Sequence, residues 1–152
     1  MICVAAQWHG WADQLIMPQG SVDYYGEMEE TVGGGPAAVR DFGRLFMAPG
    51  IAHCGMDTAP FFEAVVRWAE SGVAPETLPA SKGLPDGTTR TRPLCPHPLV
   101  AVYSGQGSTD DAANFKCGDN MVDGRKVADT ENADWRANER VWGVPFVPGA
   151  FR

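Results

Sequence analysis

The chain has 152 residues, of which 44% are apolar and 20% are charged, a composition that indicates one globular domain and excludes disordered and fibrous classes. Its formal net charge of -7 argues against nucleic acid as a partner, because phosphate binding relies on lysine and arginine side chains that release counterions. The sequence has no apolar run near the roughly 20 residues that a membrane-spanning helix needs, so we expect no membrane partner.

The chain opens with an apolar segment, residues 1–8, that we predict to be a buried strand. A signal peptide would need a basic lead and a longer apolar region before polar Gln7, so we do not interpret this segment as one. Residues 9–19 form the loop that follows, closed by Pro18, and a helix is expected to begin near Ser21.

Three consecutive glycines, residues 33–35, stand before Pro36 and are expected to end this helix. No Gly-Lys-Ser/Thr follows them and no strand directly precedes them, so a flexible connector is favoured over a phosphate-binding loop. Residues 44–48 are a second predicted buried strand, and a turn with Pro and Gly then leads to His53.

A helix is predicted after the His53 loop. Asp57 or Thr58 can cap it, Pro60 lies in its first turn, and Gly72 marks its end. Apolar residues at spacings of three and four give it a stripe that we assign to the core: Phe61, Phe62, Val65, Val66 and Ala69.

Asp13 lies in the loop after the first predicted strand, and His53 lies in the loop after the second. Open α/β sheets place their chemistry at the carboxyl ends of parallel strands. An Asp followed by a His also matches the last two members of a Ser, Asp, His triad in α/β-hydrolase order. From the residues alone, the alternatives are that Asp13 is a helix-capping or turn carboxylate and His53 a loop histidine.

The remaining polar candidates carry weaker signals. His9, at a strand end, is interpreted as a packed, backbone-bonded histidine in preference to an oxyanion-loop residue or a metal ligand with Asp13, and His97, between two prolines, is expected to be exposed. No serine lies in a Gly-x-Ser-x-Gly elbow after a strand. The five serines are Ser21, Ser71, Ser81, Ser104 and Ser108.

The second half of the chain, residues 73–117, is rich in Pro, Gly and Thr and predicts short strands, such as 99–103, within extended chain. The four cysteines have no Cys-x-x-Cys spacing, which argues against zinc and leaves disulfides or free thiols. A bridge between Cys95 and Cys117 is preferred and would stabilise by roughly 3 kcal/mol. Residues 118–152 are unassigned apart from a possible short helix over 134–141.

Several stretches, taken together and in order, resemble the C-terminal part of the tannase and feruloyl esterase family of α/β-hydrolases. They are residues 8–16 with 18–25, 44–50 with 53–55, 68–75, 91–96 and 107–115. The resemblance implies an α/β fold consisting of a partial hydrolase sheet, with its last strands and helices and a loop-rich C-terminal wrap. It assigns residues 1–117 to the C-terminal segment of a catalytic domain.

The resemblance also implies roles for individual residues. His53 would be the general base and Asp13 the carboxylate that orients it. The family's disulfide partner for Cys54 stands beside its catalytic serine; neither is found in this chain, so Cys54 is expected to be an unpaired thiol, and the state of Cys3 is left open. No cofactor and no metal site is expected.

By the same resemblance the substrate would be a carboxylic ester of an aromatic acid such as gallate or ferulate, and the protein would be secreted or periplasmic. The chain, lacking the serine, is expected to be inactive alone and to pair with the missing N-terminal part or with itself. The alternative, from another functional class, is a non-catalytic remnant or interaction module that associates through an exposed sheet edge.

Overall fold

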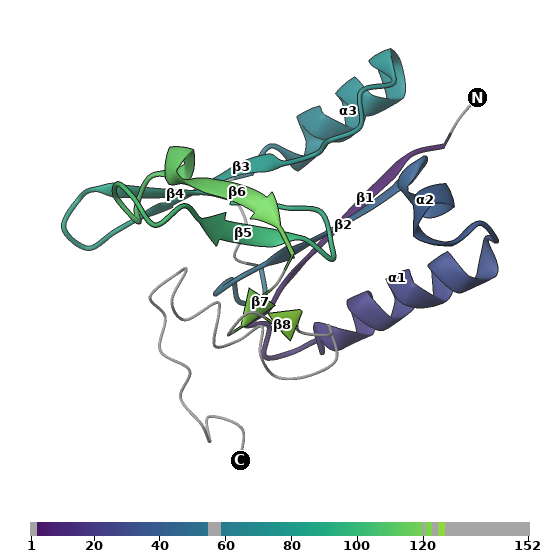
Figure 1. The fold of residues 1–152 in the computed structure, drawn as a ribbon, viewed down its shortest axis with the longest axis horizontal. Coiled ribbons are helices and arrows are strands. Elements are labelled where there is room, and N and C mark those ends of the chain that lie inside the picture. Colours follow the sequence, from purple (N-terminus) through teal and green to yellow (C-terminus); the bar gives the residue numbers. More distant parts are fainter. Residues whose placement is uncertain (1–2, 55–58, 120, 123–124, 127–152) are drawn as a thin grey trace.

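The structure is a computed structural model that describes residues 3–54, 59–119, 121–122 and 125–126. The possible helix over residues 134–141 and the capping candidates Asp57 and Thr58 lie outside the described residues. The fold is mixed α/β, with a parallel strand pair and its helices toward one end and the longer antiparallel strands toward the other (Figure 1).

The parallel pair is the part of the fold that positions the site. Strand β1 (Ala5–Gly10) leads through helices α1 (Gln19–Thr31) and α2 (Gly35–Arg40) to strand β2 (Gly43–Ala48). The two strands pair in parallel from Ala5 opposite Gly43 to Gly10 opposite Ala48. Because they are parallel and in register, the loops that follow them leave from the same edge of the sheet.

Strand β1 differs from its prediction as a buried strand over residues 1–8. It begins at Ala5 and ends at Gly10, and its residues are exposed or partly buried up to Gly10, the one buried position. Within the described residues β1 pairs with β2 alone, so its other edge has no strand to cover it. An apolar run predicts a strand, but how much of it is buried depends on its neighbours.

The glycine run ends α1 as predicted and connects it to α2. Residues 33, 34 and 35 adopt positive φ angles of 73°, 87° and 67°, a region open to glycine at little steric cost. Helix α2 begins at Gly35 with Pro36 in its first turn, which the sequence interpretation missed. The run is therefore a tight turn between two helices.

Strand β2 is the centre of the described core. On one face Phe46 and Ala48 pack with Leu78, Ala80 and Leu94 of the hairpin that follows. On its other face Leu45 packs with residues of α1 and α2, namely Val22, Tyr25 and Val39. Burial on both faces explains why this strand is a continuous apolar run in the sequence.

Helix α3 (Phe61–Ser71) only partly fills the core role predicted for it. Phe61 stacks on Trp8 of β1, with ring centroids 5.6 Å apart, and Gly72 ends the helix with a φ of 71°. Phe62, however, is 77% exposed and Ala69 is also exposed, whereas Trp68 is the buried residue. The predicted stripe is therefore wrong at these two positions, because successive helical residues lie about 100° apart and Phe61 already faces the sheet.

The C-terminal half forms antiparallel hairpins, of which the first two agree with the short strands predicted for residues 73–117, whereas the last lies in the tail that was left unassigned. Their strands are β3 (Leu78–Gly83) with β4 (Thr89–Leu94), β5 (Val100–Tyr103) with β6 (Phe115–Gly118), and β7 (Met121–Val122) with β8 (Arg125–Lys126), and the short 3₁₀ helix η1 (Ala112–Asn114) precedes β6.

The Cys95–Cys117 disulfide is confirmed and joins the end of β4 to β6, with Cα atoms 5.6 Å apart. The residues after Cys95 attach this unit to the core strand β2: Pro96 bridges Phe46, and the backbone of His97 donates to the carbonyl of Leu45. His97 is partly buried, with its ring 5.9 Å from that of Tyr25, so the prediction that it is exposed is wrong.

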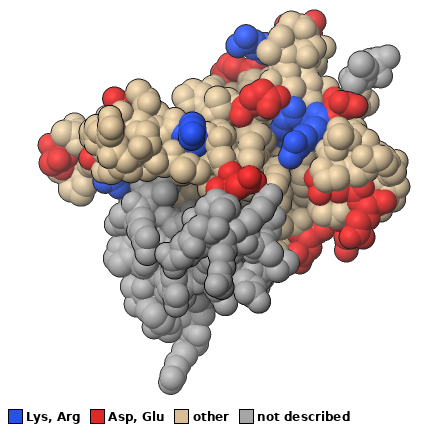
Figure 2. Space-filling model, viewed as in Figure 1, with Lys and Arg blue, Asp and Glu red and all other residues tan. Residues whose placement is uncertain are grey.

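Acidic side chains gather over α1 on the face seen in Figure 2, in keeping with the net charge of -7. Helix α1 contributes Asp23, Glu27, Glu29 and Glu30. Of the helices that the structure describes, none has the length and apolar character needed to cross a bilayer.

Candidate active site

The two strand-end loops are hydrogen-bonded to each other through their backbones. The N–H of Trp11 donates to the carbonyl of Ala48 at 2.9 Å, and that of Ala12 to the carbonyl of Ile51 at 3.0 Å. Gly10, where the first loop begins, is required by this contact, because a Cβ there would lie 2.1 Å from the carbonyl oxygen of Ile51. The close approach brings the loop that carries Asp13 beside the loop that carries His53.

Asp13 and His53 are hydrogen-bonded, as the sequence predicted. Nδ1 of His53 lies 2.9 Å from Oδ2 of Asp13. The Asp13 side chain is only 6% exposed and that of His53 is 32% exposed, so the carboxylate is covered while the imidazole can still be reached. The other carboxylate oxygen, Oδ1, accepts the backbone N–H groups of Leu15 at 2.8 Å and Ile16 at 3.0 Å.

These contacts determine the charge of Asp13. Burial by itself would raise its pKa, but hydrogen bonds from the backbone of Ile16, from His53, from the backbone of Leu15 and from His9 outweigh burial and hold the pKa well below its ordinary value. The carboxyl group is therefore ionised and can only accept hydrogen bonds. It follows that Nδ1 of His53 carries a proton and, in the neutral ring, Nε2 is left as an acceptor.

His9 makes contacts that the sequence interpretation missed. Its Nε2 lies 3.1 Å from Oδ2 of Asp13, and its Nδ1 lies 2.7 Å from the hydroxyl oxygen of Ser21 at the start of α1. The prediction of a backbone-bonded histidine is wrong, because both ring nitrogens bond to side chains. The signal available in the sequence was the four-residue spacing to Asp13, which becomes informative only once the turn after β1 is known.

The serines give no nucleophile against His53 in the described part of the chain. Ser21 contacts a histidine, but that histidine is His9. The hydroxyl of Ser71 donates to the backbone of Arg67, and that of Ser104 to the backbone of Gln106. Among the described residues, no group of three or more His, Cys, Asp or Glu side chains is arranged to hold a metal ion.

Cys54 stands directly after the histidine. It is exposed, forms no disulfide in this structure, and has a φ of 60°, which is uncommon for a residue other than glycine. Cys3 is likewise exposed and free.

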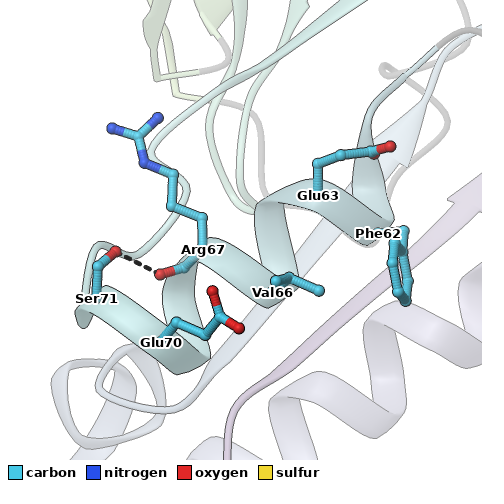
Figure 3. Close-up of a pocket in the computed structure, with 6 residues that line it drawn as sticks. All are labelled: Phe62, Glu63, Val66, Arg67, Glu70 and Ser71. Atoms are coloured by element: carbon cyan, nitrogen blue, oxygen red, sulfur yellow. Dashed lines mark hydrogen bonds between the residues drawn. The ribbon is translucent and has the colours of Figure 1, made fainter.

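A separate hollow runs along the outer face of α3 and belongs to that helix alone (Figure 3). Phe62 and Val66 supply its apolar part, and the side chains of Glu63, Arg67, Glu70 and Ser71 complete it. Neither Asp13 nor His53 lines it, so the hollow is not part of the acid and histidine site.

A parallel strand pair with a buried acid on its first strand-end loop and an accessible histidine on its second has the order and placement of the Asp and His in α/β hydrolases. The chain belongs to the tannase and feruloyl esterase family, whose model matches residues 5–118. This finding confirms the resemblance seen in the sequence.

Three relatives illustrate the match. A probable feruloyl esterase of Arthroderma benhamiae is 47% identical over 118 residues, covering 72% of this chain and 22% of the relative. A mono(2-hydroxyethyl) terephthalate hydrolase of Piscinibacter sakaiensis is 37% identical over 117 residues, covering 72% of this chain and 19% of the relative. The crystal structure of an esterase from Aspergillus oryzae matches with a TM-score of 0.68 and 31% identity, over 76% of this chain and 27% of that one. The chain thus spans about a fifth to a quarter of the proteins it matches.

Proposed function

We propose that Asp13 and His53 are the acid and the general base of a serine carboxylesterase that hydrolyses esters of aromatic acids. The observation that carries the proposal is the 2.9 Å contact between a covered carboxylate and an accessible imidazole. The substrate class is supported by the relatives' names, since ferulate and terephthalate are both aromatic acids.

The chemistry follows from the proton positions. Nε2 of His53 takes the proton of a serine hydroxyl as that oxygen attacks the ester carbonyl, and then returns it to the leaving alcohol. Asp13 holds the imidazole in the tautomer that leaves Nε2 free and stabilises the imidazolium that forms. We infer that the serine comes from a part of the esterase outside these 152 residues, which supply the last strands of the hydrolase sheet.

A graft tests the roles of both residues. Residues 5–118 replace the matching segment of the Arthroderma benhamiae relative, and the hydrolysis of methyl ferulate is measured. We expect the graft to be active, and we expect Asp13→Asn in the graft to lower kcat by about 10⁴, the effect of this substitution in a Ser-His-Asp triad. His53→Ala should lower kcat at least as much.

The matched control is Asp86→Asn. This exposed carboxylate likewise accepts a backbone N–H, that of Thr88, together with the Thr88 hydroxyl, and its partner is not a histidine. The control should keep the activity of the graft. Full activity in the Asp13→Asn or His53→Ala graft would refute the proposal. The proposal would also be refuted if the 152-residue chain by itself hydrolysed methyl ferulate and its His53→Ala variant did so equally well.

A second candidate function is an interaction module. Its specific observations are the uncovered edge of β1 within the described residues and the exposed apolar run Leu15, Ile16 and Met17, which are 71%, 58% and 76% exposed. This hypothesis predicts that the chain self-associates, and size-exclusion chromatography with light scattering tests it. A monomer at all accessible concentrations would contradict self-association.

We also propose an oxidising destination for the protein, secreted or periplasmic. The support is the Cys95–Cys117 disulfide, because such bridges persist outside the reducing cytosol.

A further inference from the structure

We propose that His9 is a positioning residue for the acid and histidine pair. It would be the middle member of a hydrogen-bond chain that runs from Gln7 through Ser21 to Asp13 and fixes the carboxylate toward His53. The inference rests on the proposed function, since it concerns the same carboxylate.

Each bond of the chain has one consistent direction. The side-chain amide of Gln7 donates to the Ser21 oxygen at 3.0 Å, so the Ser21 hydroxyl is free to donate its own proton to Nδ1 of His9 at 2.7 Å. A neutral His9 then carries its proton on Nε2 and donates it to Oδ2 of Asp13 at 3.1 Å. The direction is set on both sides of His9, by the Asp13 carboxylate, which can only accept, and by the Ser21 hydroxyl, whose oxygen already accepts from Gln7.

The chain completes the hydrogen bonding of the Asp13 carboxylate. Oδ1 is occupied by two backbone N–H groups, and Oδ2 receives His53 on one side and His9 on the other. Because its four acceptor sites are used, rotation of the carboxylate would break hydrogen bonds, and it remains an acceptor toward Nδ1 of His53. Without His9, a carboxylate that is only 6% exposed would lose one partner with little water to replace it.

The order Ser21, His9, Asp13 has the composition of a catalytic triad, but Ser21 does not fit the part of a nucleophile. The residue is 9% exposed, and its oxygen already accepts a hydrogen bond from Gln7. His9 is also better covered than His53, with 12% of its side chain exposed against 32%. The burial of Ser21 and His9 favours a structural hydrogen-bond chain over a second reaction centre.

The test reads the proton positions directly. The whole chain, labelled with ¹⁵N, has three histidines, and long-range ¹H–¹⁵N spectra of the neutral rings distinguish an Nδ1–H from an Nε2–H tautomer. In the unmodified chain we expect His53 as the Nδ1–H tautomer and His9 as the Nε2–H tautomer. In His9→Phe, which keeps a planar ring but has no donor, we expect His53 to become a mixture of tautomers.

Two variants at His9 make a matched pair. His9→Gln can place an amide N–H where Nε2 stood and should retain the His53 tautomer, whereas His9→Asn is too short to reach Asp13 and should lose it. Backbone amide spectra check that each variant is folded. If the His53 tautomer is unchanged in folded His9→Phe and His9→Asn, the proposal is overturned.

Ser21→Ala decides the question if the His9 variants do not fold. It should convert His9 from one tautomer to a mixture, and an unchanged His9 spectrum would overturn the proposed chain.

Asp13→Asn separates this proposal from the function on which it rests. A His53 tautomer that does not respond to Asp13→Asn would refute the role of the acid itself, whereas a response to Asp13→Asn without one to His9→Phe would refute only the positioning role.

Discussion

Removing the disulfide by the double substitution Cys95→Ala and Cys117→Ala should destabilise the chain by about 3 kcal/mol. The two cysteines are 22 residues apart, and closing a loop of that length removes roughly 11 cal/mol/K of entropy from the unfolded chain in the chain-entropy model. For a domain of this size the loss corresponds to a fall in Tm of roughly 10 °C. The bridge holds β6 to the end of β4, next to the residues that bind the core strand β2, so the whole hairpin region should loosen.

Urea denaturation followed by circular dichroism measures the change, with the oxidised chain as reference. Cys3→Ala is the matched control, because Cys3 is exposed and unpaired, and it should change the free energy of unfolding by less than about 0.5 kcal/mol. A reductant should lower the stability of the unmodified chain to that of the double variant and leave the double variant unchanged. A double variant within 1 kcal/mol of the oxidised chain, or one that is itself sensitive to reductant, would refute the reasoning.

Three further predictions concern the site and the core. In Gly10→Ala the added Cβ would lie 2.1 Å from the carbonyl oxygen of Ile51 and should push that backbone away. The imidazole signals of His53 in NMR spectra should then broaden or shift. Unchanged signals would contradict the close approach of the two loops at Gly10 and Ile51. Phe46→Ala, at a fully buried position of β2, should cost about 3–5 kcal/mol in urea unfolding, and a cost below 1 kcal/mol would contradict its place in the core. The lowered pKa of Asp13 should contribute stability that is present above about pH 4 and lost as the pH falls below it. Between pH 4 and 2 the free energy of unfolding of Asp13→Asn should therefore depend less on pH than that of the unmodified chain. Equal dependence of the two free energies on pH would contradict the lowered pKa.

The sequence by itself determined the elements near the site and the candidate site residues. The apolar run of β2, the turn residues around Pro18 and the glycine that ends α3 each have a local physical cause that can be seen without coordinates. Asp13 and His53 could be paired because parallel strands bring successive strand-end loops to one edge of the sheet. Cysteine spacing left disulfides or free thiols open, and the preferred Cys95–Cys117 bridge is the one that the structure contains.

Burial and side-chain partners were decided only by the tertiary structure. The stripe on α3 was periodic, yet Phe62 points to solvent, since the face a helix buries depends on where the sheet stands. His9 was expected to bond to backbone, but it bonds to Ser21 and Asp13 because the turn after β1 and the start of α1 meet in space. The spacing of residues along the chain limits which side chains can lie close together. Packing decides which polar groups are buried away from water, and those groups need hydrogen-bond partners within the protein.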